Sequence, residues 1–113
     1  IGLAHGCGNC AAITFGQAII FEAIGAFVLV SAVYGTIVAH EKPVLGGFGV
    51  GIALLAIILV VGPLTGATVN PARAFGPALV SGTFTAQAVW WVGPILGGLI
   101  AANLWDRVLL RKD

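Results

Sequence analysis

The sequence has very little charge. Only 8% of its 113 residues are Asp, Glu, Lys or Arg, whereas 59% are apolar. A soluble domain normally carries about 25% charged residues, because its surface has to be wetted. This composition excludes a water-soluble globule and predicts a chain embedded in a lipid bilayer. The net charge of +1 also provides no attraction for nucleic acid.

Methionine is absent, even at position 1. We therefore expect this chain to be a processed product or one part of a longer protein. The first ten residues carry no Lys or Arg, so they do not form the basic start of a signal peptide. Catalytic patterns are missing too, since no nucleophile–base pairing, phosphate loop or paired carboxylate set appears in register. We predict no enzyme and no cofactor.

Cysteine is scarce, and the two cysteines, Cys7 and Cys10, lie close to His5. A C-x-x-C pair with a nearby histidine could contribute to a zinc site, but the remaining ligands are missing. We prefer a surface loop with free or paired thiols over a metal site, and predict no bound metal.

Long apolar runs are abundant. Residues 16–38, 44–62 and 86–106 each provide about the 20 residues that a helix needs to cross a bilayer. The 17 glycines favour close helix packing in lipid, as in the spacings Gly47-x-x-x-Gly51 and Gly93-x-x-x-Gly97. We predict an all-α, multi-pass membrane protein with three transmembrane helices and short connections at 1–15, 39–43 and 107–113.

A fourth apolar stretch, residues 63–82, is too short to cross. Its expected helix, from Pro71 to about Val80, would be roughly 15 Å long, half the thickness of the hydrocarbon core. A surface loop is one interpretation of this stretch. We prefer a re-entrant loop and half-helix, which is tolerated at membrane depth only where protein buries it or where it lines a watery cavity.

Basic residues predict the orientation. Lys42 lies between the first two spans, and three more basic residues follow the last span: Arg107, Arg111 and Lys112. The positive-inside rule therefore places the 39–43 loop and the C-terminal tail in the cytoplasm, with residues 1–15 on the outer side. The re-entrant stretch would enter from that outer side.

The segment from Gly66 to Arg73 contains the most specific motif, Asn70-Pro71-Ala72-Arg73. Asn is a strong N-cap and Pro is favoured at the first helical position, so a helix should begin at Pro71. Its partly positive N-terminus, buried at the midplane, would oppose cations and protons. The Asn70 amide could donate to a passing water, while the carbonyls of Gly66, Ala67 and Thr68 could accept.

These residues resemble the aquaporins and aquaglyceroporins. The resemblance rests on Thr65-Gly66, on Asn70-Pro71-Ala72-Arg73 followed by Phe75-Gly76-Pro77, on Glu22 in the first span and on Trp91-Val92-Gly93-Pro94 in the last. It covers essentially the whole chain as the C-terminal half of the family fold, one unit of an inverted repeat. It implies a passive channel for water, assembled as a homotetramer of complete pores, and a complementary N-terminal half carrying the other half-helix.

The resemblance also implies roles for the two charges inside the spans. Arg73 would stand in the outer constriction and donate to the permeating molecule; a lipid-anchoring arginine is the alternative. Glu22 would accept hydrogen bonds behind the re-entrant loop, and a proton relay is the alternative role. Two filter positions are Ile58 and Ala67, apolar and small respectively, which favours a wider constriction that also admits glycerol, ammonia or similar neutral solutes. Without a cysteine at position 67, mercury inhibition through that site is not expected.

Two other classes of membrane protein are consistent with this sequence. Half of an ion-coupled secondary transporter would also use a broken helix at the midplane, although a second buried ionisable residue would be expected in the spans. A structural membrane protein with negligible flux would share the same helices. Only transport measurements separate these classes from a channel.

Overall fold

The computed structural model describes residues 13–39, 41 and 44–110, and this part of the chain contains helices and no strands. Three long helices are α1 (Phe15–Val33), α2 (Gly47–Thr65) and α4 (Gln87–Leu104). A shorter helix, α3 (Pro71–Ser81), lies between α2 and α4 in the sequence. Five-residue π-helices, η2 (Tyr34–Val38) and η3 (Trp105–Leu109), continue α1 and α4.

The lengths of these helices divide them into two kinds. Phe15–Val38, Gly47–Thr65 and Gln87–Leu109 contain 24, 19 and 23 residues and are long and apolar enough to cross a membrane. The 11 residues of α3 extend only about 16 Å at the α-helical rise. The predicted all-α membrane fold, with three spanning helices and one half-helix, is therefore confirmed.

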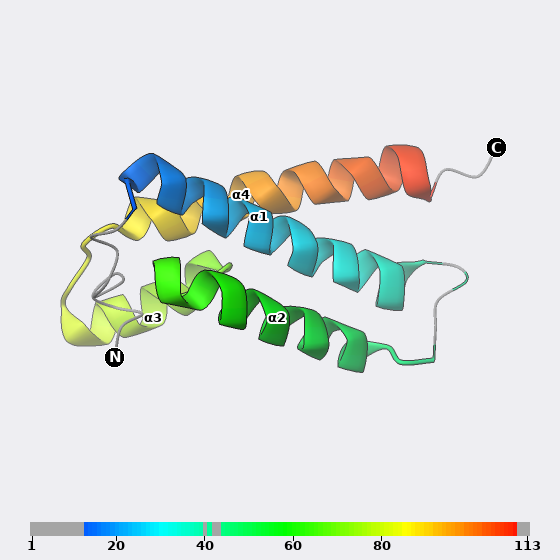
Figure 1. The fold of residues 1–113 in the computed structure, drawn as a ribbon, viewed down its shortest axis with the longest axis horizontal. Helices are drawn as coiled ribbons and strands as arrows, with labels where there is room; N and C mark the ends of the chain where they lie inside the picture. Colours follow the sequence, from blue (N-terminus) through cyan, green and yellow to red (C-terminus); the bar gives the residue numbers. More distant parts are fainter. Residues whose placement is uncertain (1–12, 40, 42–43, 111–113) are drawn as a thin grey trace.

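The spanning helices lie roughly side by side along the 48 Å axis of the molecule (Figure 1). α1 packs most extensively against α4, and then against α2. The short helix α3 occupies only the end of the bundle where α2 finishes and where α1 and α4 begin (Figure 1). A chain that leaves α2, turns back and continues as α3 at the same end has the form of a re-entrant segment.

Glycines of α4 allow its close approach to α1. A Cβ atom added to Gly97 would lie 1.9 Å from the carbonyl oxygen of Ala23, and one added to Gly93 would lie 2.7 Å from that of Ile19. The predicted small-residue contact is therefore present at this pair. Gly47 and Gly51 have no atom within 4 Å of an added Cβ in the described part of the chain, so their spacing makes no such contact here.

Some helix ends differ from the sequence-based boundaries. α2 begins at Gly47 rather than 44 and continues to Thr65, although 62 is the expected last residue. Pro63 lies inside its final turns, which is tolerated in spanning helices because neighbouring groups satisfy the freed backbone. α1 begins in a capping box between Thr14 and Gln17, and η3 extends the last helix to Leu109.

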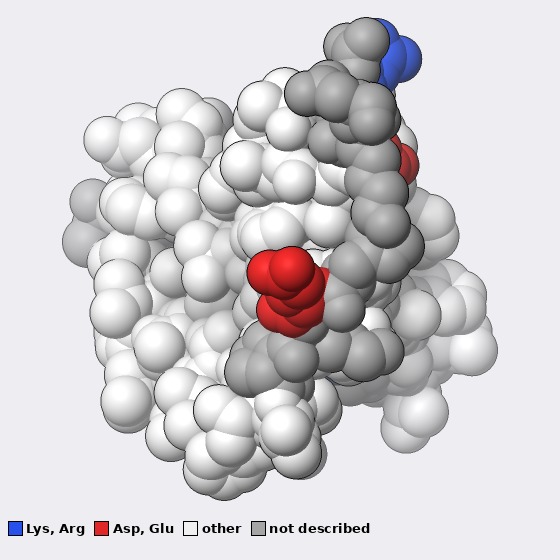
Figure 2. Space-filling view, turned by 90° about the vertical axis from the view of Figure 1, so that its right-hand side faces the viewer, with Lys and Arg blue, Asp and Glu red and all other residues white. Residues whose placement is uncertain are grey.

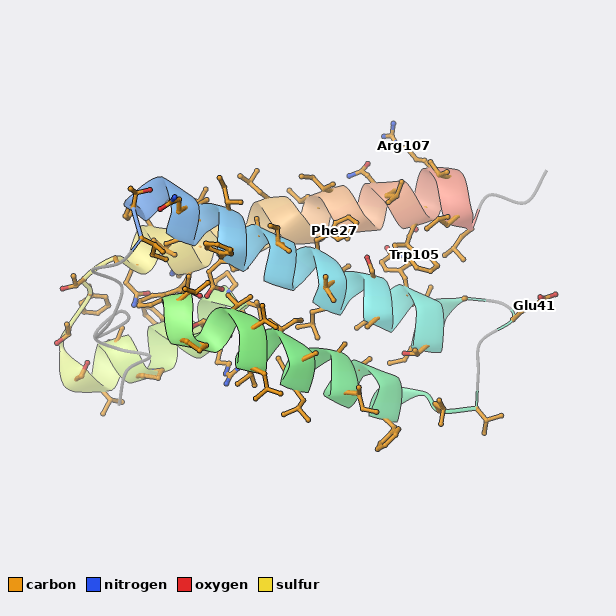
Figure 3. The ribbon with its side chains drawn as sticks, viewed as in Figure 1. Phe27, Glu41, Trp105 and Arg107 are labelled. Carbon is orange, nitrogen blue, oxygen red and sulfur yellow. The ribbon has the colours of Figure 1, made fainter. Side chains whose placement is uncertain are left out.

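Two charged side chains lie at the end of the bundle opposite α3. Glu41 and Arg107 both lie there, and the Trp105 ring points between α4 and α1 (Figure 3). Viewed from this end, the described charged residues form small, separate patches among uncharged ones (Figure 2). Lys42, Arg111 and Lys112, on which the predicted orientation also depends, lie outside the described residues.

Candidate functional site

The start of α3 has the local structure predicted from its sequence. Asn70 is the N-cap in extended conformation, with φ −158° and ψ 120°, and Pro71 is the first helical residue. The Asn70 Oδ1 accepts from the backbone nitrogens of Ala72 at 2.9 Å and Arg73 at 3.4 Å. Because the carboxamide oxygen is engaged by the helix, the NH₂ group is the part of Asn70 that another molecule can meet.

This helix start lies on an accessible surface of the chain. Asn70, Ala72 and Arg73 are exposed, and Pro71 is half-buried. The free amides and the aligned peptide dipoles of a helix concentrate partial positive charge at its N-terminus. An exposed amide donor, a guanidinium group and a helix N-terminus therefore share one surface of the molecule.

Behind the helix start, Glu22 of α1 is completely buried. Its carboxylate accepts hydrogen bonds from the Thr65 hydroxyl at 2.5 Å, from the Thr68 nitrogen at 3.1 Å and from the Val69 nitrogen at 2.6 Å. A buried carboxylate is costly unless it is hydrogen-bonded, and two backbone amides outside regular structure need an acceptor. The bonds meet both requirements and join α1 to the re-entrant segment.

The backbone of this segment is strained. Ala67 has φ 46° and Val69 has φ 44°, values that residues with a side chain rarely adopt, whereas Gly66 at φ 89° is suited to its position. Each left-handed residue costs about 1–2 kcal/mol. Gly25 of α1 leaves room for Val69, since an added Cβ there would lie 2.6 Å from the Val69 Cγ1. Contacts with α1 thus hold a conformation that the chain would not adopt alone.

The residues whose carbonyls are predicted to act as acceptors in the pore wall differ in exposure. Gly66 is half-buried, but Ala67 and Thr68 have 0% of their surface exposed in this half of the fold. The lining of a passage by these carbonyls stays a prediction.

The two predicted filter residues are close neighbours of one glycine. A Cβ added to Gly62 would lie 3.7 Å from the Ile58 Cγ2 and 4.0 Å from the Ala67 Cβ. Ile58 is 37% exposed on α2, whereas Ala67 is buried. The structure thus brings the two positions together, and Ile58 provides the accessible apolar surface of the pair.

Two residues take part in this site with roles that the sequence did not predict. Thr65, besides donating to Glu22, accepts at its hydroxyl from the Ala67 nitrogen at 3.2 Å. Trp90 of α4 donates its indole N–H to the Thr65 carbonyl oxygen at 3.0 Å. In the sequence, Thr65 belongs to the Thr65-Gly66 motif and Trp90 lies in the last span, but neither position specifies a partner.

The prediction that no metal is bound concerns residues near the N-terminus. His5, Cys7 and Cys10 do not belong to the described residues. Among residues 13–39, 41 and 44–110, no group of three or more His, Cys, Asp or Glu side chains could hold a metal ion.

Three spanning helices with a half-helix at one end, and a buried carboxylate behind its exposed, Asn-capped start, have the form of one repeat unit of a membrane channel. Comparison with known proteins agrees. The family model described as Major intrinsic protein matches residues 4–105. The chain therefore belongs to the major intrinsic protein family, a family of membrane channels, and is an integral, multi-pass membrane protein.

Similar proteins are plant aquaporins. The chain is 46% identical over 103 residues to Aquaporin TIP4-1 of Arabidopsis thaliana, covering 88% of this chain and 41% of that protein. It is 42% identical over 99 residues to Aquaporin TIP4-4 of Zea mays, covering 85% and 39%. Identity to Probable aquaporin TIP1-1 of Oryza sativa subsp. japonica is 40% over 112 residues, covering 96% and 45%. The chain thus spans about two fifths of the length of these relatives.

Proposed function

We propose that this chain forms one half of a passive channel that carries water and excludes ions and protons. The observation that carries the proposal is the exposed start of α3, where Asn70 caps the helix with its oxygen and leaves its NH₂ group accessible. The relatives named aquaporins, at up to 46% identity, support the same substrate.

Proton exclusion follows from the chemistry of this helix start. A water that accepts from the Asn70 NH₂ group turns its oxygen toward the donor and its hydrogens away, so it is poorly oriented to accept from the next water in line. That orientation interrupts the chain of hydrogen bonds along which a proton hops. The partial positive charge of the helix N-terminus and the guanidinium of Arg73 add an electrostatic barrier to cations.

Glycerol, ammonia and similar neutral solutes form a second group of candidate substrates. The specific observation is that Ile58 is accessible and apolar, and that the neighbouring side chain at position 67 is only a methyl group. With Arg73 as the polar member of the filter, these residues would make a constriction wider and less polar than one lined by histidine.

Glu22 would act as support for the re-entrant segment rather than as a proton relay. Its carboxylate is fully buried and accepts three hydrogen bonds, two of them from backbone amides. A relay needs a group that is free to pass a proton along the pathway, whereas this carboxylate is buried behind the re-entrant segment and holds it through these three bonds.

The complete pore would need a complementary N-terminal half that supplies a second half-helix. The relatives are more than twice as long as the matched segment, which leaves room for such a half. Exposed apolar side chains cover α2, among them Leu55, Leu59 and Val60, and would contact lipid or protein. We further propose that four complete pores form a homotetramer and that transport involves no chemical turnover.

Osmotic shrinkage of vesicles containing the complete channel tests this function. Stopped-flow light scattering should show water permeability far above that of empty vesicles, and a pH-sensitive dye should show no added proton leak. Glycerol uptake in the same vesicles tests the second group of substrates. Flux that requires an ion gradient would instead indicate a secondary transporter, and flux equal to that of empty vesicles a structural protein.

A further inference from the structure

Trp90 makes a hydrogen bond whose acceptor has few alternatives. Its indole N–H donates to the Thr65 carbonyl at 3.0 Å, and both residues are only 1% exposed. Thr65 is the last residue of α2, where helix carbonyls have no partner within the helix. A buried carbonyl without a partner is destabilising. The indole of α4 therefore satisfies the end of α2 at the point where the re-entrant segment begins.

This bond belongs to a network that fixes both ends of the strained segment. Glu22 of α1 accepts from the amides of Thr68 and Val69 at its far end. At its near end, Thr65 is held by Trp90 through the carbonyl and by Glu22 through the hydroxyl. Residues 66–69, in which Ala67 and Val69 have positive φ, are thus held at one end by α4 and at both ends by α1.

The contact between α1 and α4 explains how one network joins both helices. Gly93 follows Trp90 by one turn, and a Cβ added there would lie 2.8 Å from the Cβ of Glu22. The helices therefore touch where they carry the two anchoring side chains. Movement of either helix would move one end of the segment relative to the other.

We propose that Trp90 is a positioning residue. Its indole N–H holds the end of α2 and thereby fixes where the start of α3 at Asn70 lies. Its effect on selectivity rests on the function proposed above, whereas its effect on the segment does not. The competing explanation is that Trp90 merely fills space, since its ring packs with Ala18, Ala74 and Val89. Phenylalanine would keep an aromatic ring in that space but would lack the donor.

Trp90→Phe in the complete channel distinguishes these explanations, with Trp91→Phe as the matched control. Trp91 also loses an indole donor, but it is 43% exposed and its N–H donates to Gln87 of its own helix. We expect W90F to accelerate amide hydrogen exchange in residues 66–70 by about tenfold, the effect of losing one buried hydrogen bond. We also expect a higher ratio of glycerol to water permeability per channel. W91F should leave both quantities at the wild-type level.

The outcomes separate this inference from the proposed function. Wild-type exchange in W90F, in a channel that conducts water, would overturn the positioning role alone. Faster exchange in W90F, together with no water flux through the wild-type protein, would leave that role standing and overturn the proposed function.

A measurement on the wild-type channel keeps the test decisive if W90F fails to fold. With ¹⁵N-labelled tryptophan, the Trp90 indole N–H should exchange with D₂O at least about tenfold more slowly than that of Trp91. Equal exchange of the two indoles would contradict the bond to Thr65.

Discussion

The carboxylate of Glu22 and the backbone nitrogen of Val69 lie 2.6 Å apart, although 47 positions separate them in the sequence. This bond links the first spanning helix to the residue immediately before Asn70. Val69 is held at φ 44°, and the adjoining Gly25 has no side chain that would displace it. The position of the half-helix is therefore determined by α1 as much as by its own sequence.

Replacing Glu22 by Gln should destabilise the fold. The amide oxygen of Gln can still accept, but its NH₂ group would be a donor facing other N–H or O–H donors, which would lose their acceptor. We expect the free energy of unfolding to fall by about 3 kcal/mol, as when a charged acceptor of several buried hydrogen bonds is lost. Thermal unfolding in detergent measures this. Glu41→Gln is the control, because Glu41 is exposed in the loop after η2; equal stability of both variants would refute the supporting role.

Substitutions of Asn70 should separate its capping role from its donor role. Asn70→Ala loses the cap, at a cost of about 1 kcal/mol, together with the donor. Asn70→Asp retains a good cap but replaces the donor by a negatively charged acceptor. We expect N70D to keep wild-type stability and to admit protons or cations, measured as dye-reported leak in vesicles. Asn103→Asp is the control, because Asn103 is exposed and its amide donates to Leu99 of its own helix; this variant should not admit protons or cations. An N70D channel that admits neither would argue against the donor role of Asn70.

Replacing Arg73 by Val should widen solute selection. The guanidinium is exposed beside the start of α3, and a hydrogen bond from a charged donor contributes about 1.5–3 kcal/mol. We expect glycerol permeability relative to water to rise by about tenfold. Arg107→Val, at the opposite end of the bundle (Figure 3), should leave this ratio unchanged. Unchanged selectivity in R73V would show that Arg73 is not part of the selectivity filter.

Gly97→Ala should loosen the packing of α4 on α1. The new methyl group would lie 1.9 Å from a backbone oxygen, and backbone cannot yield as a side chain can. We expect a loss of about 1–3 kcal/mol or more in unfolding free energy. At the next position, Gly98→Ala would only meet the Val30 Cγ2 at an ordinary 3.6 Å. Equal melting temperatures for G97A and G98A would show that the two helices are not packed as described.

Composition and local motifs predicted most of the architecture. Apolar length alone separated the spanning helices from the half-helix, and Asn70-Pro71 predicted the residue at which α3 begins, because caps are determined by neighbouring residues. The end of α2 was placed three residues too early, at 62. A proline normally ends a helix, but here the last turn contains Pro63 and is continued to Thr65 by tertiary contacts.

The parts that sequence reasoning missed are all set by contacts between distant residues. The bond from Trp90 to Thr65 joins positions 25 apart, and nothing in either local sequence specifies the other. The positive φ values of Ala67 and Val69 were also unexpected, because these residue types disfavour them. Such conformations persist only where surrounding structure enforces them.

The central claim is that the start of α3 at Asn70 faces water in the middle of the membrane. A high-resolution cryo-EM map of the complete channel in lipid tests it most directly, through the density next to the Asn70 Nδ2 atom. We expect a continuous file of ordered waters, one of which lies within hydrogen-bond distance of that nitrogen. A dry protein contact at Asn70, or a position at the outer membrane surface, would contradict the account.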